Sequence, residues 1–427
     1  MRVRKTDHAL VFFDCRHGKG KKLHWKSKKI TLYIDGGINK DYNMCTEVIT
    51  MLTKMYLTNF LSFKERTEFD FTASKYSILG KTNVYENEIL KGALLIGPNA
   101  SGKSNVLKGI SFIIKMIKGE GTTFASYRCF FSRNPITTVE YEFLFENKKV
   151  YYIIEFNVQE NSISETLKID DVIVLLRNAN RGELRIGQAV TIDERVDSET
   201  LFLRTASFNT GRFPQEPTLR KLMDFLQNSY IIDGYNLGAP YGKTITRYAE
   251  EFGVEKINKY LEAFKYDFFV EYGSESEGAG LKISIGSDRK AVFLKRKSFP
   301  IPNIIVNESQ GNQVFADLLP NLISVIENPG MLIIDEFGNS LHNKLAEKII
   351  KFFMETANDS QIFITSHHTN LISNSVFRPD QVDLISFQEK SGSIVKRLSQ
   401  FKPREAQNLE KMYLGGMFEG LPTYEEI

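Results

Sequence analysis

Long apolar segments and paired cysteines are both missing from this chain of 427 residues. No run of about 18 apolar residues occurs, and the basic N-terminus has no apolar core, so we expect neither a membrane span nor a signal peptide. The three cysteines, Cys15, Cys45 and Cys129, lie far apart and show no metal-binding spacing. They favour a reducing compartment, and we therefore expect a cytoplasmic protein.

The sequence lacks the motifs and repeats that are typical of several functional classes. No repeat, low-complexity tract or heptad pattern of useful length is present, which excludes a long coiled coil. Neither an H-E-x-x-H motif nor a histidine cluster of the HNH type occurs, so no destructive chemistry is recognisable. The composition, with 42% hydrophobic and 25% charged residues, is that of a globular protein. A chain of this length can bury a large core, and we expect two lobes.

Basic charge is concentrated at one end of the chain. The formal net charge is +3, but residues 1–30 hold ten basic and two acidic side chains, or +8, which leaves −5 elsewhere. This basic arm could contact nucleic acid, although a solvated extension is the commoner explanation for such a run. Its Gly/Lys-rich segment, 18–22, has no strand and helix beside it and so does not read as a phosphate-binding loop.

An octapeptide of the form G-x-x-x-x-G-K-S lies between an apolar run, 93–96, and a helix-patterned stretch, 105–117. In such a loop the backbone N–H groups surround the phosphates, the lysine reaches the β- and γ-phosphates, and the serine hydroxyl binds Mg²⁺. A surface turn that binds nothing is the alternative, but the strand and helix on either side favour a nucleoside triphosphate. The residues expected to bind ATP are Gly97, Pro98, Asn99, Ala100, Ser101, Gly102, Lys103, Ser104 and Asn105.

A second apolar strand, Met331–Ile334, ends in Asp335 and Glu336. Buried parallel strands end at the edge of the sheet where open α/β sheets bind ligands. We expect Asp335 to hold Mg²⁺ through water, and Glu336 to orient the attacking water and accept its proton. Two solvated acids at a strand end are the alternative, which the upstream phosphate loop disfavours.

A third strand, Gln361–Ile364, is followed by Thr365, Ser366, His367 and His368. A histidine at such a strand tip can hydrogen-bond the γ-phosphate and so detect whether it is present. We assign this role to His367 and expect His368 to be its outward-facing neighbour. A purely structural histidine is the alternative.

The separation of Lys103 from Asp335, 232 residues, is too long for a compact GTPase or kinase core. Other structure must therefore be inserted between the two halves of one nucleotide site. Shortly before the acidic strand, a Ser-x-Gly sequence at Ser309 and Gly311 opens a helix-like segment, 313–326. The free N–H groups and dipole of a helix N-terminus bind anions, although a plain N-cap is the alternative.

Together these motifs resemble the ABC-type ATPase head of RecF-type and SMC-type proteins. The signature of this chain contains Gln310 and Asn312. At these positions, the signatures of such heads often contain Gly, Asp or Thr. No Q-loop glutamine can be assigned. The motifs that carry the resemblance are the phosphate loop, the Glu-Ser-Gln-Gly signature 308–311, the strand end 333–337, the loop 339–342 and the Thr-Ser-His sequence 365–367.

A narrower resemblance, over roughly residues 55–422, is to bacterial AAA-type ATPases of abortive-infection systems, the AbiL and RloA group. The segments that carry it are 59–63, 201–204, 369–372 and 408–416. Chains of that group start near Met55, so residues 1–54 are either an upstream extension or an appended element.

The resemblance implies an enzyme that hydrolyses ATP to ADP and phosphate with Mg²⁺, with Lys103, Glu336 and His367 as catalytic residues. It also implies a head-to-tail dimer or larger homo-oligomer, in which Ser309 and Gly311 of one copy cap the ATP of the other. The cellular role implied is antiviral, beside a separate effector such as a Toprim-type nuclease. A RecF-like DNA-binding clamp and an ATP-stabilised scaffold with negligible turnover are the alternatives.

The expected fold is α/β, an ABC-type P-loop ATPase head with a mixed central sheet, a strand-rich arm and an inserted helical subdomain. The expected domains are a basic extension (1–54), lobe I with the phosphate loop and β arm (55–210), a helical insertion (211–270), and lobe II with the signature, acidic strand, switch histidine and tail (271–427). Strands are expected at 138–145, 149–157, 171–177, 281–285 and 291–294, a hairpin turn at 147–148, helices across 218–266 and a loop at 273–280.

Overall fold

The computed structural model describes residues 50–418 apart from 87, 121–122, 210, 212 and 234–241, and the short stretches 5–6, 9–10, 29–32 and 40–43. The chain divides into two compact units, Met1–Ile49 and Thr50–Ile427. The described residues of the first unit form two antiparallel strand pairs, β1 (Lys5–Thr6) with β2 (Ala9–Leu10) and β3 (Lys29–Leu32) with β4 (Lys40–Asn43).

Most of the predicted basic arm lies outside the described residues, and so do Cys15 and Cys45. Cys129 is described and is a buried free thiol. The second unit begins with strand β5 (Thr50–Thr58), so its start differs from the predicted domain boundary at Met55.

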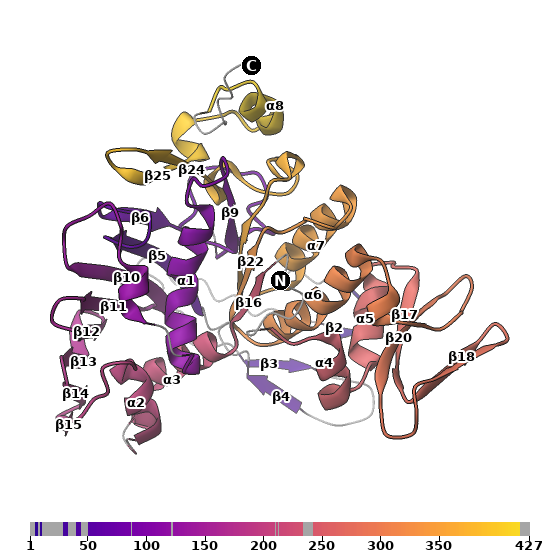
Figure 1. Ribbon diagram of the computed structural model, residues 1–427, viewed down its shortest axis with the longest axis horizontal. Coiled ribbons are helices and arrows are strands. Elements are labelled where there is room, and N and C mark those ends of the chain that lie inside the picture. Colours follow the sequence, from indigo (N-terminus) through magenta and orange to yellow (C-terminus); the bar gives the residue numbers. More distant parts are fainter. Residues whose placement is uncertain are drawn as a thin grey trace. The chain divides into compact units, whose positions relative to one another are not determined.

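A six-stranded sheet, parallel except at one edge, lies at the centre of the second unit (Figure 1). The edge strand β25 pairs antiparallel with β24, whereas all other neighbouring strands of the sheet pair parallel to each other. The three strands that carry the predicted motifs, β9, β22 and β23, are neighbours and end at the same edge. The strand order is β16 (Tyr230–Asp233), β22 (Met331–Asp335), β23 (Gln361–Thr365), β9 (Gly92–Ile96), β24 (Val382–Gln388) and β25 (Gly392–Arg397).

Helices cover both faces of this sheet (Figure 1). Met331 and Ile333 of β22 join the core around α1 (Lys103–Lys118), whereas Leu332 and Ile334 join the core that contains α6 (Gln310–Glu327) and α7 (Asn343–Thr356). Successive side chains of a strand point to opposite faces, so a strand covered on both sides must be apolar throughout. This explains the uninterrupted apolar runs that precede each motif.

A second sheet, antiparallel and eight-stranded, packs on the opposite side of α1 (Figure 1). Gly109 of α1 permits the close approach, because a Cβ there would lie 2.9 Å from side-chain atoms of Leu57 in β5. The Tyr141 hydroxyl also donates to the Gly109 carbonyl at 2.6 Å. The strand order is β15 (Ala189–Asp193), β14 (Arg181–Ile186), β13 (Val172–Asn178), β12 (Ser162–Ile169), β11 (Lys148–Asn157), β10 (Ile136–Phe145), β5 and β6 (Thr67–Asp70).

Two local predictions are wrong. The hairpin turn between β10 and β11 lies at Glu146 and Asn147, whose φ angles are 49° and 70°, and Lys148 already belongs to β11. Residues 273–280, predicted as a loop, contain β18 (Glu275–Gly278), which pairs with β19 (Leu281–Ser284). The Ser/Gly/Glu composition of β18 hides it from a pattern search because little of the strand is apolar.

The predicted helical segment 211–270 contains a strand as well as helices. Its strand β16 joins the central sheet beside β22, so this segment also contributes to the sheet that carries the site. Among the described residues, no helix combines the length and apolar character needed to cross a membrane. The remaining elements are α2 (Phe202–Asn209), α3 (Pro217–Gln227), α4 (Ile245–Phe252), α5 (Glu255–Ala263), α8 (Leu409–Leu414), β7 (Val84–Tyr85), β8 (Ile89–Leu90), β17 (Phe268–Gly273), β20 (Ala291–Arg296) and β21 (Asn303–Ile304).

A buried ion pair joins the eight-stranded sheet to α2. Arg177 and Glu165, whose side chains are 1% and 0% exposed, form a salt bridge of 3.0 Å. The other carboxylate oxygen of Glu165 accepts from the Tyr152 hydroxyl at 2.5 Å, and the carboxylate also accepts the backbone N–H of Phe202, which opens α2, at 2.7 Å. The charge of Glu165 is therefore compensated by a cation and by a helix N-terminus.

We expect Arg177→Met to lower the free energy of unfolding by about 3–5 kcal/mol, because it leaves a buried carboxylate without its cation. Urea unfolding followed by circular dichroism measures the change. Arg247→Met is the matched control, because Arg247 pairs with Glu251 on the surface of α4 and is 68% exposed. A loss of stability no larger than that of the control would contradict the structural role of the buried pair.

Candidate functional site

The predicted phosphate loop connects β9 to α1, and both of its glycines lie in close contact with other atoms. A Cβ on Gly97 would lie 2.0 Å from the carbonyl oxygen of Ile385 in β24. Gly102 has a φ of 107°, and a Cβ there would lie 2.2 Å from Ser393 Oγ and 2.7 Å from Ser62 Oγ. Glycine is therefore required at both positions, by packing in each case and by backbone conformation at Gly102.

The Lys103 ammonium is directed back across this loop. Lys103 Nζ donates to the carbonyl oxygens of Gly97 at 2.9 Å and Pro98 at 2.8 Å. Burial lowers the pKa of Lys103, and the nearby carboxylates of Asp335 and Glu336 oppose that shift. Among the described residues, the hydrogen-bond acceptors of this cation are neutral carbonyls, and an anionic phosphate would be a stronger acceptor.

Side-chain oxygen atoms from the start of α1 and from the ends of β22 and β23 meet beside the loop. Asp335 Oδ1 accepts from Ser104 Oγ at 3.1 Å and from Thr365 Oγ1 at 2.5 Å. A hydroxyl and a carboxylate are ligands that suit Mg²⁺, which also retains water and binds phosphate oxygens. Among the described residues, no group of three or more His, Cys, Asp or Glu side chains forms a metal site.

Glu336 occupies a backbone corner directly after β22. Its φ of 55° lies in the left-handed region, which costs a non-glycine residue about 1 kcal/mol or more. The corner is held by hydrogen bonds to β23 and its end: Glu336 N–H donates to Thr365 Oγ1 at 2.7 Å, and Phe337 N–H donates to the Thr365 carbonyl at 2.8 Å. The Ser366 hydroxyl donates to the Phe337 carbonyl at 2.7 Å. These bonds stabilise the strained conformation.

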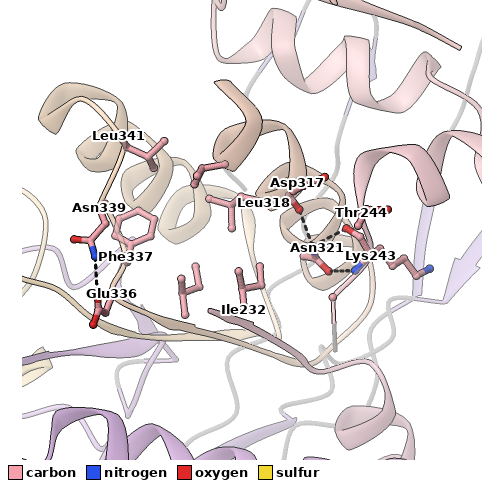
Figure 2. Close-up of a pocket in the computed structure, with 14 residues that line it drawn as sticks. Ile232, Lys243, Thr244, Asp317, Leu318, Asn321, Glu336, Phe337, Asn339 and Leu341 are labelled. Atoms are coloured by element: carbon pink, nitrogen blue, oxygen red, sulfur yellow. Dashed lines mark hydrogen bonds between the residues drawn. The ribbon is translucent and has the colours of Figure 1, made fainter. Parts of the chain in front are cut away.

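A pocket lies beside Glu336, between the end of β22 and helix α6 (Figure 2). At one end, Asn339 Nδ2 donates to Glu336 Oε2 at 2.5 Å. At the other end, Asp317 accepts the backbone N–H of Ile245 at 2.9 Å, and burial raises the pKa of Asp317 to about 6. The apolar lining between the two ends consists of Ile232, Val314, Leu318, Ile334, Phe337 and Leu341.

The two histidines after β23 differ from the predicted arrangement. His367 is the more exposed of the two, whereas His368 is partly buried, and a Cβ on Gly338 would lie 3.4 Å from the His368 ring. The prediction that His368 faces outward is therefore wrong, because its ring packs on the turn after Glu336. Partial burial of the His367 ring and the nearby Lys103 lower the pKa of His367, against the opposing effect of the acids at the end of β22.

The predicted signature lies at the N-terminus of α6. Ser309 is the N-cap residue, but its exposed side chain makes no capping hydrogen bond to the helix. A Cβ on Gly311 would lie 2.5 Å from the carbonyl oxygen of Ser340, so packing within the chain already requires glycine there. Within the described part of the chain, no hydrogen bond joins Ser309 or Gly311 to the phosphate loop.

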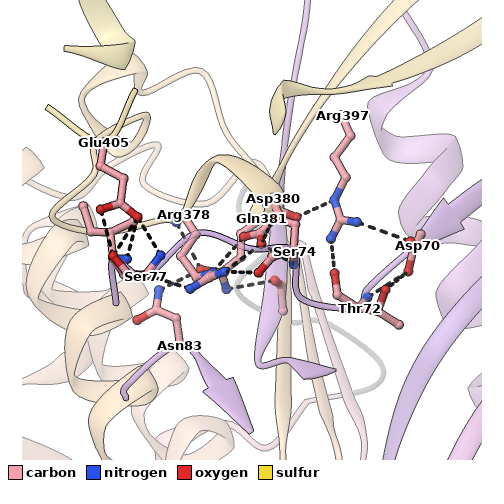
Figure 3. Close-up of polar contacts among 12 residues, drawn as sticks. Asp70, Thr72, Ser74, Ser77, Asn83, Arg378, Asp380, Gln381, Arg397 and Glu405 are labelled. Carbon is pink, nitrogen blue, oxygen red and sulfur yellow. Dashed lines mark hydrogen bonds and ion pairs between the residues drawn. The ribbon is translucent and has the colours of Figure 1, made fainter. Parts of the chain in front are cut away.

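The C-terminal tail is attached to the segment that follows the two histidines. Thr369 Oγ1 donates to Glu410 Oε1, in α8, at 2.9 Å. Glu405 in turn accepts the backbone N–H groups of Ser77 at 2.6 Å and Ile78 at 3.0 Å (Figure 3). The tail therefore contacts both the segment that follows His368 and the loop that follows β6.

A buried ion pair lies next to this contact (Figure 3). Arg378 and Asp380 are 1% and 0% exposed at their side chains and form a salt bridge of 2.8 Å. Asp380 Oδ2 also accepts the Ser74 hydroxyl at 2.6 Å, and Arg397 Nε donates to the Asp380 carbonyl at 2.6 Å. Since Arg397 also pairs with Asp70 at 3.4 Å, this network connects β6 to the edge of the central sheet.

Several residues in this region were not predicted as site residues. Thr365 connects Asp335 with the Glu336 backbone, and the Thr-Ser-His sequence that contains it was the signal available for it. Asn339 lies in a loop that the sequence only marked as part of a resemblance. Ser62 and Ser393 lie under the phosphate loop, and the hydrogen bond of 2.7 Å between them joins positions 331 residues apart. No sequence signal marked Ser393.

A family model matches two stretches of this chain, 93–222 and 244–373, and is described as "AAA domain, putative AbiEii toxin, Type IV TA system". These stretches make up more than half of the sequence and contain the phosphate loop, Ser309, Gly311 and the two motif strands β22 and β23. The chain belongs to this AAA-domain family. The predicted α/β class with a mixed central sheet is confirmed, and the assignment to the ABC type stays a prediction. The narrower AbiL and RloA assignment stays a prediction.

Two solved structures are similar to this AAA-domain chain. An SMC head domain from Thermotoga maritima is 14% identical with a TM-score of 0.46, and the match covers 81% of this chain and 98% of that chain. A structure of the SmcHead bound to the C-winged helix domain of ScpA is 12% identical with a TM-score of 0.48, and covers 81% and 96%. At these values the likeness bears on neither activity nor partners. No curated protein matched the chain.

We expect Thr365→Val to lower ATP turnover about 10- to 100-fold and to raise the Mg²⁺ concentration needed for half-maximal rate, because Asp335 and the Glu336 backbone both lose a partner. Steady-state phosphate release over a Mg²⁺ series measures this. Thr365→Ser retains the hydroxyl and should recover most of the rate. Equal rates for Thr365→Val and the wild type would show that the hydroxyl does not position the two acids.

Proposed function

We propose that this chain is a Mg²⁺-dependent ATPase that acts as a nucleotide-driven dimeric switch. The observation that carries the proposal is the contact of Ser104 in the phosphate loop with Asp335 at 3.1 Å, immediately next to Glu336. A serine hydroxyl, a metal-binding carboxylate and an adjacent carboxylate base are the groups that phosphoryl transfer to water requires. Ser104 and Asp335 are 231 residues apart in the sequence and meet at one edge of the sheet.

The proposed roles follow from the chemistry of each group. Backbone N–H groups of the loop, residues 97–105 apart from Pro98, and the Lys103 ammonium bind the phosphates, and Ser104 and Asp335 hold Mg²⁺, which neutralises phosphate charge. Glu336 accepts a proton from the attacking water. His367, whose pKa is lowered, is largely neutral at pH 7 and can donate one N–H to the γ-phosphate.

Helix α6, which begins at the predicted signature, is the basis for proposing a dimer. Ser309 is exposed and leaves the first N–H groups of the 18-residue helix α6 without a side-chain cap. Such a helix end favours an anion through its free donors and its dipole. Since Ser309 and Gly311 make no hydrogen bond to the phosphate loop of their own chain among the described residues, we assign them to the ATP bound by a second copy. ATP binding then closes the dimer, and hydrolysis opens it.

For the cell, we propose a cytoplasmic sensor subunit of an anti-phage abortive-infection system of the AbiL and RloA group. Two observations support this: the resemblance in the segments 59–63, 201–204, 369–372 and 408–416, and the family description, which includes the words "AbiEii toxin". No destructive chemistry is recognisable in the sequence, so toxicity is assigned to a separate effector, such as a Toprim-type nuclease. We also propose that the basic arm contacts nucleic acid.

We expect Glu336→Gln to bind Mg·ATP with unchanged affinity, to lose hydrolysis, and to accumulate as a dimer, because the closed state is no longer released. Mass photometry with and without Mg·ATP measures the shift, and phosphate release measures the turnover. In the Glu336→Gln background, Ser309→Arg should abolish the dimer, because a long side chain fills the space that the γ-phosphate of the partner needs.

Lys103→Ala is the control for nucleotide binding and should lose both ATP affinity and the dimer, because the phosphates lose a cation. Turnover by Glu336→Gln at the wild-type rate would disprove its role as base. A mass that does not depend on nucleotide would leave a monomeric ATPase or a constitutive oligomer. Comparing turnover with and without DNA separates the switch from a DNA-binding clamp.

We expect the gene expressed alone to be harmless and unprotective, and to restrict phage only together with a neighbouring effector gene. Lys103→Ala should abolish that protection at equal protein abundance, because the sensor no longer changes state. Efficiency of plating and an immunoblot measure both quantities. Full protection by this gene alone would overturn the two-component proposal.

A further inference from the structure

The candidate base has a side-chain partner in its own chain. Asn339 Nδ2 donates to Glu336 Oε2 at 2.5 Å, and both residues line the same end of the pocket shown in Figure 2. We propose that Asn339 is a positioning residue that orients the Glu336 carboxylate toward the attacking water and connects it to the signature helix. This inference rests on the proposed function, because it assumes that Glu336 is the base.

The backbone and the side chain of Glu336 are held by different groups. Thr365 fixes the backbone corner through the Glu336 N–H, at 2.7 Å, but does not reach the carboxylate. Among the described residues, Asn339 is the donor that hydrogen-bonds the Glu336 carboxylate. A glutamate has three side-chain torsions, so without this bond its carboxylate would sample several orientations at an entropic cost to the reaction.

The chemistry of an asparagine suits this task. Its amide donates a hydrogen bond without adding a charge, so Oε2 is fixed by a neutral donor. Oε1 is then left to accept a proton. In the reaction, the water oxygen forms a bond to the γ-phosphorus, the bond from that phosphorus to the bridging oxygen breaks, the electron pair leaves with ADP, and the water proton moves to Oε1.

The turn that carries Asn339 also lies against the signature helix. The turn is tight: Asn339 N–H donates to the Glu336 carbonyl at 3.3 Å, and Leu341 N–H to the Gly338 carbonyl at 2.8 Å. The next carbonyl, that of Ser340, would lie only 2.5 Å from a Cβ on Gly311. The first turn of α6 therefore cannot move toward this turn without displacing Ser340, and with it Asn339. Capping of a partner's nucleotide is thereby connected to the orientation of the base in the same chain.

The first test separates positioning from folding or binding. Asn339→Ala should lower kcat for ATP hydrolysis about 10- to 100-fold while the dissociation constant for Mg·ATP stays within about twofold of the wild type. Asn339→Gln, which retains an amide, should recover part of kcat, and Asn339→Leu, which has a similar size but no donor, should not. Asn343→Ala is the matched control, because Asn343 is an exposed asparagine at the start of α7.

The second test concerns the connection to the signature helix. Gly311→Ala should lower kcat, because its Cβ displaces the Ser340 carbonyl. If this effect passes through Asn339, the double variant Gly311→Ala/Asn339→Ala should have nearly the kcat of Asn339→Ala alone. If the two losses instead multiply, Gly311 acts independently and the connection is disproved.

The outcomes distinguish this inference from the proposal on which it rests. An inactive Glu336→Gln variant together with wild-type kcat in Asn339→Ala would overturn the positioning role and leave the ATPase assignment intact. Wild-type turnover by Glu336→Gln would overturn the base assignment itself. A rise in kcat for Asn339→Ala would mean that Asn339 restrains the base, which also contradicts the inference.

Discussion

The contact of Ser104 and Thr365 with one carboxylate oxygen of Asp335 is the interaction on which the rest of the candidate site depends. It joins the ends of β22 and β23 to the first turn of α1, the helix that follows β9, so it depends on the observed order of these three parallel strands. Parallel strands deliver their carboxyl ends to one edge, and apolar side chains on both faces hold them there. The position of the phosphate loop relative to the acids is thus a consequence of strand order.

The backbone at this edge of the sheet is strained at Glu336. Glu336 adopts a left-handed backbone conformation that a glycine would adopt without cost, and hydrogen bonds from and to Thr365, Phe337 and Ser366 compensate for it. The chain thereby turns away from the sheet directly after Asp335 and brings Asn339 back to the Glu336 carboxylate. A strained corner that is held by the neighbouring strand positions a side chain more precisely than a flexible loop does.

Much of the fold could be predicted from local pattern. The three motif strands and helices α1 and α6 were predicted because buried strands and amphipathic helices leave periodic apolar marks. Strand β18 was missed because its Ser, Gly and Glu residues leave no such mark, and β16 was absorbed into a helical segment although it pairs with β22. Short or polar strands depend on their partners, which lie far away in sequence.

By itself, the sequence determined the chemical groups: a phosphate loop, an acidic strand end and a histidine-bearing strand end, each recognisable because its residues are contiguous. Only the tertiary structure decided which residues support them. Ser62 and Ser393 under the phosphate loop, Thr365 between the two acids, Asn339 on Glu336 and His368 on Gly338 could not be ranked from the sequence. The reason is physical: these contacts depend on strand order, on a positive φ at Glu336 and on packing across hundreds of residues, none of which leaves a local pattern.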